Sequence, residues 1–169
     1  AGRGFGLRDR MATQVERSRL EKHDAVTALK LILAITLVVE GVVAVILAAR
    51  LFGTYHESLG LAVWHGLFHS VSAFNNAGFS SYSDSVMGFQ NDPLILGPLM
   101  FAVILTALGF PVMQDLRTNG IAWRRWSLHT KITVAGTAAL LAFGFCATLA
   151  MEWHNPETLG PMGWGAKIL

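Results

Sequence analysis

The sequence predicts an all-α integral membrane protein. Hydrophobic residues make up 53% of its 169 residues and charged residues only 14%, against about 25% charged residues in soluble globular proteins. The mean hydropathy is positive, at +0.47. Three apolar stretches are long enough to cross a bilayer, and a shorter apolar segment lies between the first two. This composition excludes a disordered chain and an ordinary soluble domain.

The three candidate membrane spans follow one another along the chain. The first covers residues 31–49 and is interrupted only by Glu40. The second covers residues 94–113 and the third residues 132–151, and neither contains a charged residue. Because a helix needs roughly 20 residues to cross the hydrocarbon core, each stretch is predicted to form one transmembrane helix.

The positions of the basic residues predict the orientation of these spans. Lys and Arg fall almost entirely in residues 1–30 and 115–131, and none lies between residues 51 and 93. By the positive-inside rule, the N-terminus and the 115–131 loop are expected in the cytoplasm and the 51–93 segment outside. The pI of about 9.0 therefore reflects charges beside a membrane, and no nucleic-acid partner is expected. We expect a multi-pass protein of the cell membrane, surrounded by the lipid bilayer.

The segment between the first two spans predicts a re-entrant hairpin. Residues 61–74 (LAVWHGLFHSVSAF) suit an amphipathic helix of about 14 residues, which is too short to cross a membrane. The following residues, NNAGFSSYSDS, are too polar and too rich in Asn, Gly and Ser to continue as a buried helix. Irregular backbone at membrane depth is tolerated only where protein buries it or water lines it, so this hairpin indicates a pore.

Residues 75–80 are the candidate ion-binding segment of that pore. A potassium-selective filter replaces the ion's hydration shell with backbone carbonyl oxygens, and a glycine lets the strand adopt the conformation that this requires. The negative end of the short helix would also point toward the cation. The predicted filter residues are Asn75, Asn76, Ala77, Gly78, Phe79 and Ser80, with the Phe79 side chain bracing the strand from behind. The alternative is an extracellular loop in which Asn-Ala-Gly is ordinary turn chemistry.

Other polar residues in apolar surroundings are candidates for supporting roles. Glu40 is a structural or functional carboxylate of the first span, and a packing role that ties this span to the short helix or to a neighbour is favoured. Gly109 and Pro111 are candidate hinge residues in the second span. His65 and His69 lie four residues apart, but no third ligand accompanies them, so hydrogen bonding behind the filter is favoured over a metal site. No serine lies in a nucleophile elbow, so an enzyme is not expected.

Several motifs in fixed order resemble the Trk/Ktr/HKT superfamily of potassium transporters. They are FHSVSAFNNAGFSSYSDS (68–85), LGFPVMQDL (108–116) and SLHTKI (127–132), with GLRDRMATQ near the start and EWHNPETLGPMGWGAKIL at the end. The resemblance implies a pseudo-fourfold pore made of four M1–pore helix–M2 repeats, as in potassium channels. This chain is most similar to the second repeat followed by the M1 helix of the third.

The resemblance also implies how the chain divides. A cytoplasmic linker covers 1–24, one repeat covers 25–116, a cytoplasmic loop covers 117–130, and the next M1 with the start of its extracellular segment covers 131–169. Within the repeat, M1 covers about 25–50, the pore helix about 61–74, the filter 75–80 and M2 about 94–114. Gly78 matches the filter glycine, at which Gly rather than Ser is typical of the potassium-conducting members.

The resulting hypothesis is a potassium uptake protein. Potassium is the transported ion, held only by filter carbonyls, with Na⁺ or H⁺ as a candidate coupling ion and no cofactor in this chain. The resemblance implies three kinds of protein partner: the remaining repeats of the same polypeptide, a second copy in a homodimer, and a cytoplasmic nucleotide-binding regulatory subunit. The alternatives are a subunit of a homotetrameric two-span cation channel and a membrane scaffold that transports nothing.

Overall fold

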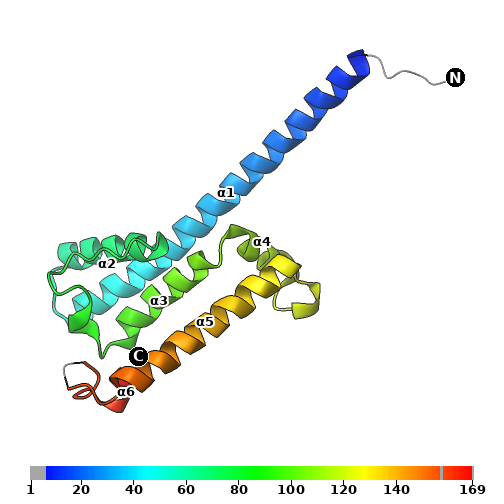
Figure 1. Ribbon diagram of the computed structural model, residues 1–169. Coiled ribbons are helices and arrows are strands. Elements are labelled where there is room, and N and C mark those ends of the chain that lie inside the picture. The colour runs from blue at the N-terminus through cyan, green and yellow to red at the C-terminus, as the bar shows by residue number, and fades with distance from the viewer. Residues whose placement is uncertain (1–6, 157, 169) are drawn as a thin grey trace. The chain divides into compact units, whose positions relative to one another are not determined.

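The computed structural model describes residues 7–156 and 158–168, and every regular element in that part of the chain is helical (Figure 1). The helices are α1 (Leu7–Thr54), α2 (Leu59–Phe74), η1 (Met87–Phe89), α3 (Pro93–Ala107), α4 (Phe110–Asn119), η2 (Trp123–Arg125), α5 (Leu128–Glu152) and α6 (Trp164–Ile168). The prediction of an all-α protein is confirmed. The chain divides into two units, Ala1–Val38 and Val39–Leu169, and the packing described below lies within the second.

Helix α1 contains the first predicted span and begins earlier than the sequence suggests. Its segment Ala25–Thr54 has 30 residues and is long and apolar enough to cross a membrane. Residues 7–24, predicted as a linker, are helical as well, whereas residues 1–6 lie outside the described residues. The reason is local, since residues 7–24 contain no Gly or Pro and are rich in Arg, Leu and Glu, which favour helix.

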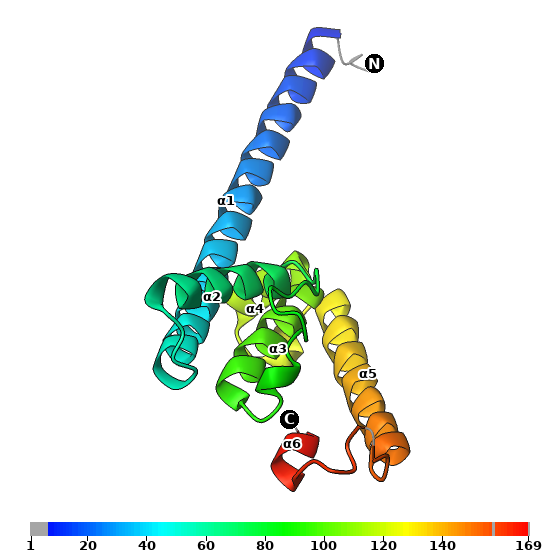
Figure 2. The same cartoon turned by 90° about the vertical axis from the view of Figure 1, so that its left-hand side faces the viewer.

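Helix α2 packs against the C-terminal part of α1 at Gly66. A Cβ atom on Gly66 would lie 2.8 Å from the carbonyl oxygen of Ala44 and 2.9 Å from the backbone nitrogen of Ala48, so this close approach requires glycine. One turn later, the Ser70 hydroxyl donates a hydrogen bond to the Glu40 carbonyl oxygen over 2.7 Å. Helix α2 also lies beside α3 in both views (Figures 1 and 2). The buried apolar residues where these helices meet are Val43, Leu47, Leu51, Ala62, Ala73, Phe89, Ile95 and Ala102.

An ion pair joins the end of α1 to the start of α3. The Arg50 Nε atom lies 2.7 Å from the Asp92 carboxylate, which also accepts hydrogen bonds from the Tyr55 hydroxyl over 3.1 Å and from the Leu94 N–H over 3.0 Å. Asp92 is therefore both the N-cap of α3 and the partner of α1. Burial alone would raise the pKa of Asp92, but the hydrogen bonds from Arg50, Leu94 and Tyr55 outweigh it and lower the pKa.

Replacing Asp92 with asparagine should destabilise the protein at neutral pH by about 2 kcal/mol, because the substitution removes a buried charge-assisted hydrogen bond and leaves Arg50 without its counter-ion. The pKa of Asp92 is lowered on folding. Its contribution is therefore complete above the unfolded-state pKa of about 4 and disappears as the pH falls through the lower folded-state value. Thermal unfolding in detergent should show a gap between wild type and Asp92→Asn that narrows below about pH 4. A gap that is independent of pH would contradict the assignment.

The second predicted span is divided into two helices. Helices α3 and α4 meet at an angle of 96°, so the expected single helix over 94–113 is not what the structure contains. Gly109 adopts a φ of +83° at the break, and Pro111 lies in the first turn of α4. A residue with a positive φ, followed two positions later by a proline that has no N–H, cannot continue the hydrogen-bond pattern of a helix. The candidate hinge residues thus lie at the bend.

Helix α5 is the third predicted span, and it begins at Leu128 because Ser127 caps it. The Ser127 hydroxyl accepts a hydrogen bond from the Thr130 N–H. The Ser127 N–H donates to the Asp115 carboxylate over 2.8 Å, and the Asn119 side chain donates to the same carboxylate over 2.6 Å. The Asp115 carboxylate therefore joins α4 to α5. The structure thus has two helices that can cross a membrane, or three spans if α3 and α4 count as one.

Candidate functional site

The loop after α2 contains the predicted filter residues, and its first turn follows from the sequence. The Ala77 N–H donates to the Ser72 carbonyl over 2.9 Å, and the Asn76 N–H donates to the Ala73 carbonyl over 3.0 Å. Asn76 has a φ of +51°. This is the Schellman pattern that ends many helices, in which asparagine is one of the few residues that tolerate the left-handed position. Helix α2 therefore ends at Phe74, as predicted, and the chain reverses over Asn75 and Asn76.

The backbone of residues 75–78 is open to a ligand. Residues 75–79 are exposed in this chain, and Gly78 has a φ of +72°. The carbonyl oxygens of residues 75–78 accept no hydrogen bond from any other described residue. A run of carbonyl oxygens without internal partners, at the negative end of a helix, is suited to binding a dehydrated cation.

The loop is held against both neighbouring spans by the side chains of its two asparagines. The Asn75 amide donates to the Val71 carbonyl over 2.9 Å and lies 3.4 Å from a carboxylate oxygen of Glu40 on α1. The Asn76 amide donates to the Thr106 hydroxyl of α3 over 2.9 Å. These contacts support the packing role expected for Glu40. Thr106 is a supporting residue that sequence reasoning missed, although a hydroxyl group in an otherwise apolar span was a signal that could have found it.

The far end of the loop is anchored on His69 of α2. The Nδ1 atom of His69 lies 2.8 Å from the His65 carbonyl oxygen and its Nε2 atom 3.0 Å from the Ser80 hydroxyl. The same hydroxyl donates to the Ser85 carbonyl and accepts from the Tyr82 N–H. His69 therefore makes hydrogen bonds to the far end of this loop, and the assignment of the loop as a filter stays a prediction. Among the described residues, no group of three or more His, Cys, Asp or Glu side chains is placed to hold a metal.

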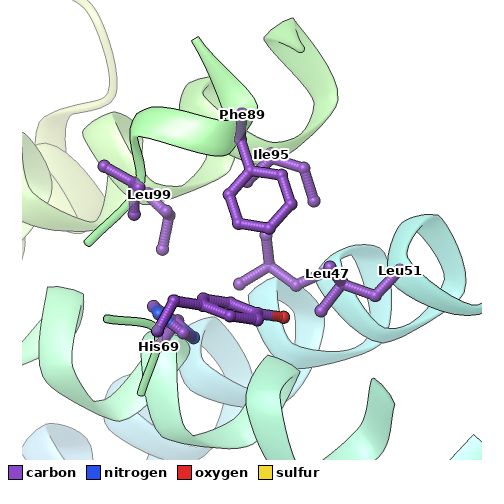
Figure 3. Close-up of a pocket in the computed structure, with 8 residues that line it drawn as sticks. Leu47, Leu51, His69, Phe89, Ile95 and Leu99 are labelled. Carbon is purple, nitrogen blue, oxygen red and sulfur yellow. The ribbon is translucent and has the colours of Figure 1, made fainter. Parts of the chain in front are cut away.

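Aromatic and aliphatic side chains pack around His69 and Tyr82. Figure 3 shows His69 facing a small pocket lined by α1, η1 and α3. The Tyr82 ring stacks on His69 with ring centroids 5.3 Å apart and meets Phe89 edge to face. Its hydroxyl donates to Glu57 over 2.7 Å. Burial, and then the hydrogen bond to Glu57, raise the pKa of Tyr82, so the phenol remains a neutral donor. The residues lining the pocket are Leu47, Leu51, His69, Tyr82, Val86, Phe89, Ile95 and Leu99.

Phe79 does not brace the loop within this chain. Its side chain is 71% exposed, and its carbonyl oxygen instead accepts a hydrogen bond from the Ser72 hydroxyl over 2.8 Å. Ser72 and His69, both on α2, therefore hold the part of the loop that the Phe79 ring was expected to hold. The sequence predicted a hydrogen-bonding role for His69, but neither its partner Ser80 nor the contact made by Ser72 could be named, because both depend on how the chain reverses after residue 74.

Comparison with known proteins identifies a family of cation transport proteins and relatives named for potassium uptake. The family model TrkH, described as a cation transport protein, matches residues 5–149. The chain is 35% identical over 159 residues to Ktr system potassium uptake protein B of Bacillus subtilis, which covers 94% of this chain and 35% of that protein. It is 38% identical over 147 residues to the protein of the same name from Vibrio alginolyticus, which covers 83% of this chain and 30% of that protein.

A further relative has a broader name. Potassium/sodium uptake protein NtpJ of Enterococcus hirae is 31% identical over 145 residues, which cover 85% of this chain and 31% of that protein. The chain thus spans about a third of the length of each of these relatives.

Proposed function

Because the chain belongs to the TrkH family of cation transport proteins, we propose that it forms part of a potassium uptake pore in which residues 75–80 are one strand of the selectivity filter. The observation that carries this proposal is the run of unpartnered carbonyl oxygens at residues 75–78, fixed at both ends to α2. No charged side chain lies within residues 75–80. Ion binding there would therefore depend on backbone dipoles.

The proposed mechanism is replacement of hydration. An ion that enters the loop exchanges its hydration water for carbonyl oxygens, which bind it with a similar free energy. No carboxylate within residues 75–80 binds the ion so tightly that its release becomes slow. Glu40 serves this strand indirectly, because its carboxylate lies 3.4 Å from the Asn75 side-chain amide. The bend at Gly109 is a candidate hinge in the helix pair that follows the filter. We propose that the protein is a transporter and not an enzyme.

One loop supplies only one strand, whereas a filter surrounds the ion on several sides. We propose that the other strands come from further repeats of the same polypeptide. The chain's span of about a third of its relatives' length supports this arrangement. None of the apolar part of α5 is buried within the described chain, so this helix offers a surface for lipid or for further repeats.

Partners on the inner side are a further part of the proposal. Two relatives are named as proteins of a Ktr system, which supports assembly with other subunits. We propose a homodimer with a cytoplasmic nucleotide-binding regulatory subunit at the basic inner loops. Exposed side chains suited to such a contact are Arg117, Arg124 and Arg125. Coupling to Na⁺ or H⁺ stays a hypothesis that transport measurements would decide.

Cysteine accessibility tests the filter assignment. In the full-length protein, with native cysteines including the exposed Cys146 replaced by serine, Ala77→Cys should react with a membrane-impermeant thiol reagent more slowly in K⁺ than in Na⁺. An ion bound at the loop carbonyls would block access. The measurement is the modification rate in right-side-out vesicles.

Ser83→Cys is the matched control, because Ser83 is exposed in the same outer segment but lies outside the filter residues. Its rate should not depend on the cation. If Ala77→Cys reacts equally fast in both cations, residues 75–80 form an ordinary extracellular loop and the scaffold alternative gains support. If crosslinking shows a fourfold assembly of the chain, the homotetrameric channel is favoured instead.

A further inference from the structure

Ser72 contacts the filter loop on both sides of Gly78. Its carbonyl oxygen accepts the Ala77 N–H over 2.9 Å, and its hydroxyl donates to the Phe79 carbonyl over 2.8 Å. Ser72 is only 8% exposed and lies in the last turn of α2. A single residue of a helix thus fixes the backbone immediately before and immediately after the filter glycine.

These two contacts matter because Gly78 itself does little to restrict the backbone conformation of the loop. It lies in the left-handed region, at a φ of +72°, and has no other atoms within 4 Å of the position that a Cβ would take. Packing around Gly78 therefore does not hold the peptide groups in place. Glycine is the residue with the most backbone freedom, so the orientation of the adjoining carbonyls depends on contacts made by its neighbours.

The Ser72 hydroxyl also divides the carbonyls into two groups. The Phe79 carbonyl is directed toward α2 by its hydrogen bond, whereas the carbonyls of residues 75–78 accept no hydrogen bond within the described chain. Without the hydroxyl, the peptide between Phe79 and Ser80 would lose the donor that orients it. Its carbonyl oxygen would then be free to turn away from α2 and add to the possible ion ligands.

We propose that Ser72 is a positioning residue that sets ion selectivity, because its hydroxyl keeps the Phe79 carbonyl out of the set of ion ligands. This inference rests on the proposed function of residues 75–80. It assigns no contact between Ser72 and the ion. It predicts that loss of the hydroxyl changes the K⁺/Na⁺ uptake ratio and has a smaller effect on the amount of folded protein.

The test is cation uptake by the full-length protein in cells that lack their own potassium uptake. Ser72→Ala should lower the ratio of uptake efficiency for K⁺ over Na⁺ by about three- to tenfold, the range expected when one neutral hydrogen bond is lost. Ser72→Thr keeps the hydroxyl, and its extra methyl group has space because residue 72 lines an open hollow of about 300 Å³. This variant should therefore keep the wild-type ratio. The readout is kcat/KM for each cation, normalised to protein in the membrane.

Ser70→Ala is the matched control. Ser70 is a fully buried serine of the same helix, but its hydroxyl donates to the Glu40 carbonyl on α1 and not to the loop. This variant should lower the amount of folded protein and leave the ratio unchanged. If Ser72→Ala is not found in the membrane, Ser72→Cys gives the same comparison, because a thiol is similar in size and only a weak donor.

Two failures can be told apart. If the wild-type protein transports no potassium, the proposed function is overturned, and the inference falls with it. If the wild type transports potassium with a preference over sodium and the ratio is the same in Ser72→Ala, or falls equally in Ser70→Ala, only the role of Ser72 is overturned.

Discussion

Replacing Gly78 with serine in the full-length protein should lower the preference for K⁺ over Na⁺ by about tenfold. Gly78 has a φ of +72°, a conformation that costs other L-residues roughly 1–2 kcal/mol, and each 1.4 kcal/mol corresponds to about a factor of ten. No atom lies within 4 Å of the new Cβ position, so steric clash is not the cause. The strand would instead relax toward negative φ and reorient the carbonyls of Ala77 and Gly78. Competitive uptake of the two cations measures the effect.

Gly60→Ser is the matched control for this substitution. Gly60 lies in the first turn of α2, has nothing within 4 Å of its Cβ position and does not have a positive φ. Serine should therefore be tolerated there without a change of selectivity. Gly78→Ala should behave like Gly78→Ser, because the strain comes from the backbone and not from the hydroxyl. Unchanged selectivity in both Gly78 variants would remove residues 75–80 from the ion pathway.

The short helix before the predicted filter was the element best predicted from the sequence. Residues 61–74 were expected, and α2 covers Leu59–Phe74. The signal was strong at the C-terminal end, because two asparagines followed by Ala-Gly cannot prolong an apolar helix. The N-terminal end was less clear, since the cap is the Ser58 hydroxyl, which accepts the Leu61 N–H over 3.4 Å. The local chain therefore determines where this helix stops.

The bend between α3 and α4 was only partly predictable. Hydropathy predicts one span over residues 94–113, because a run of apolar residues does not indicate whether the helix is straight or bent. Gly109 and Pro111 marked the place, but a helix can also tolerate proline, as it does at Pro98 inside α3. The difference is the positive φ of Gly109, which is a property of the folded backbone. The 96° angle therefore had to come from the structure.

Residue types did not predict the partners of the side chains that hold the predicted filter loop. Ser72, His69 and Thr106 each bind an atom that lies close only after the chain has reversed over Asn76 and Gly78. In the sequence, His69 and Thr106 are recognisable only as polar side chains in apolar segments, and Ser72 does not differ from the neighbouring serines. Their roles depend on the left-handed conformations of two loop residues, and a pattern of spacings contains no information about those torsion angles.

The contact between α1 and α2 should not tolerate any side chain at Gly66. A Cβ there would lie 2.8 Å and 2.9 Å from backbone atoms of Ala44 and Ala48, and these atoms cannot move without displacing α1. We expect Gly66→Ala to destabilise the protein by about 2 kcal/mol or more, as overpacking of a close contact does. Gly66→Val, which adds two further carbons, should leave little folded protein. Size-exclusion chromatography and thermal unfolding in detergent measure both effects.

Gly60→Ala separates this steric effect from the general effect of replacing a helical glycine. Gly60 belongs to the same helix and has nothing within 4 Å of its Cβ position, so alanine there should leave stability unchanged or raise it by up to about 1 kcal/mol through helix propensity. Displacement of α2 in Gly66→Ala would also stretch the bond between Ser70 and Glu40 and move the start of the filter loop. Residual Gly66→Ala protein should therefore show reduced potassium uptake per molecule. Full stability and normal uptake in Gly66→Ala would show that α1 and α2 do not pack at this glycine.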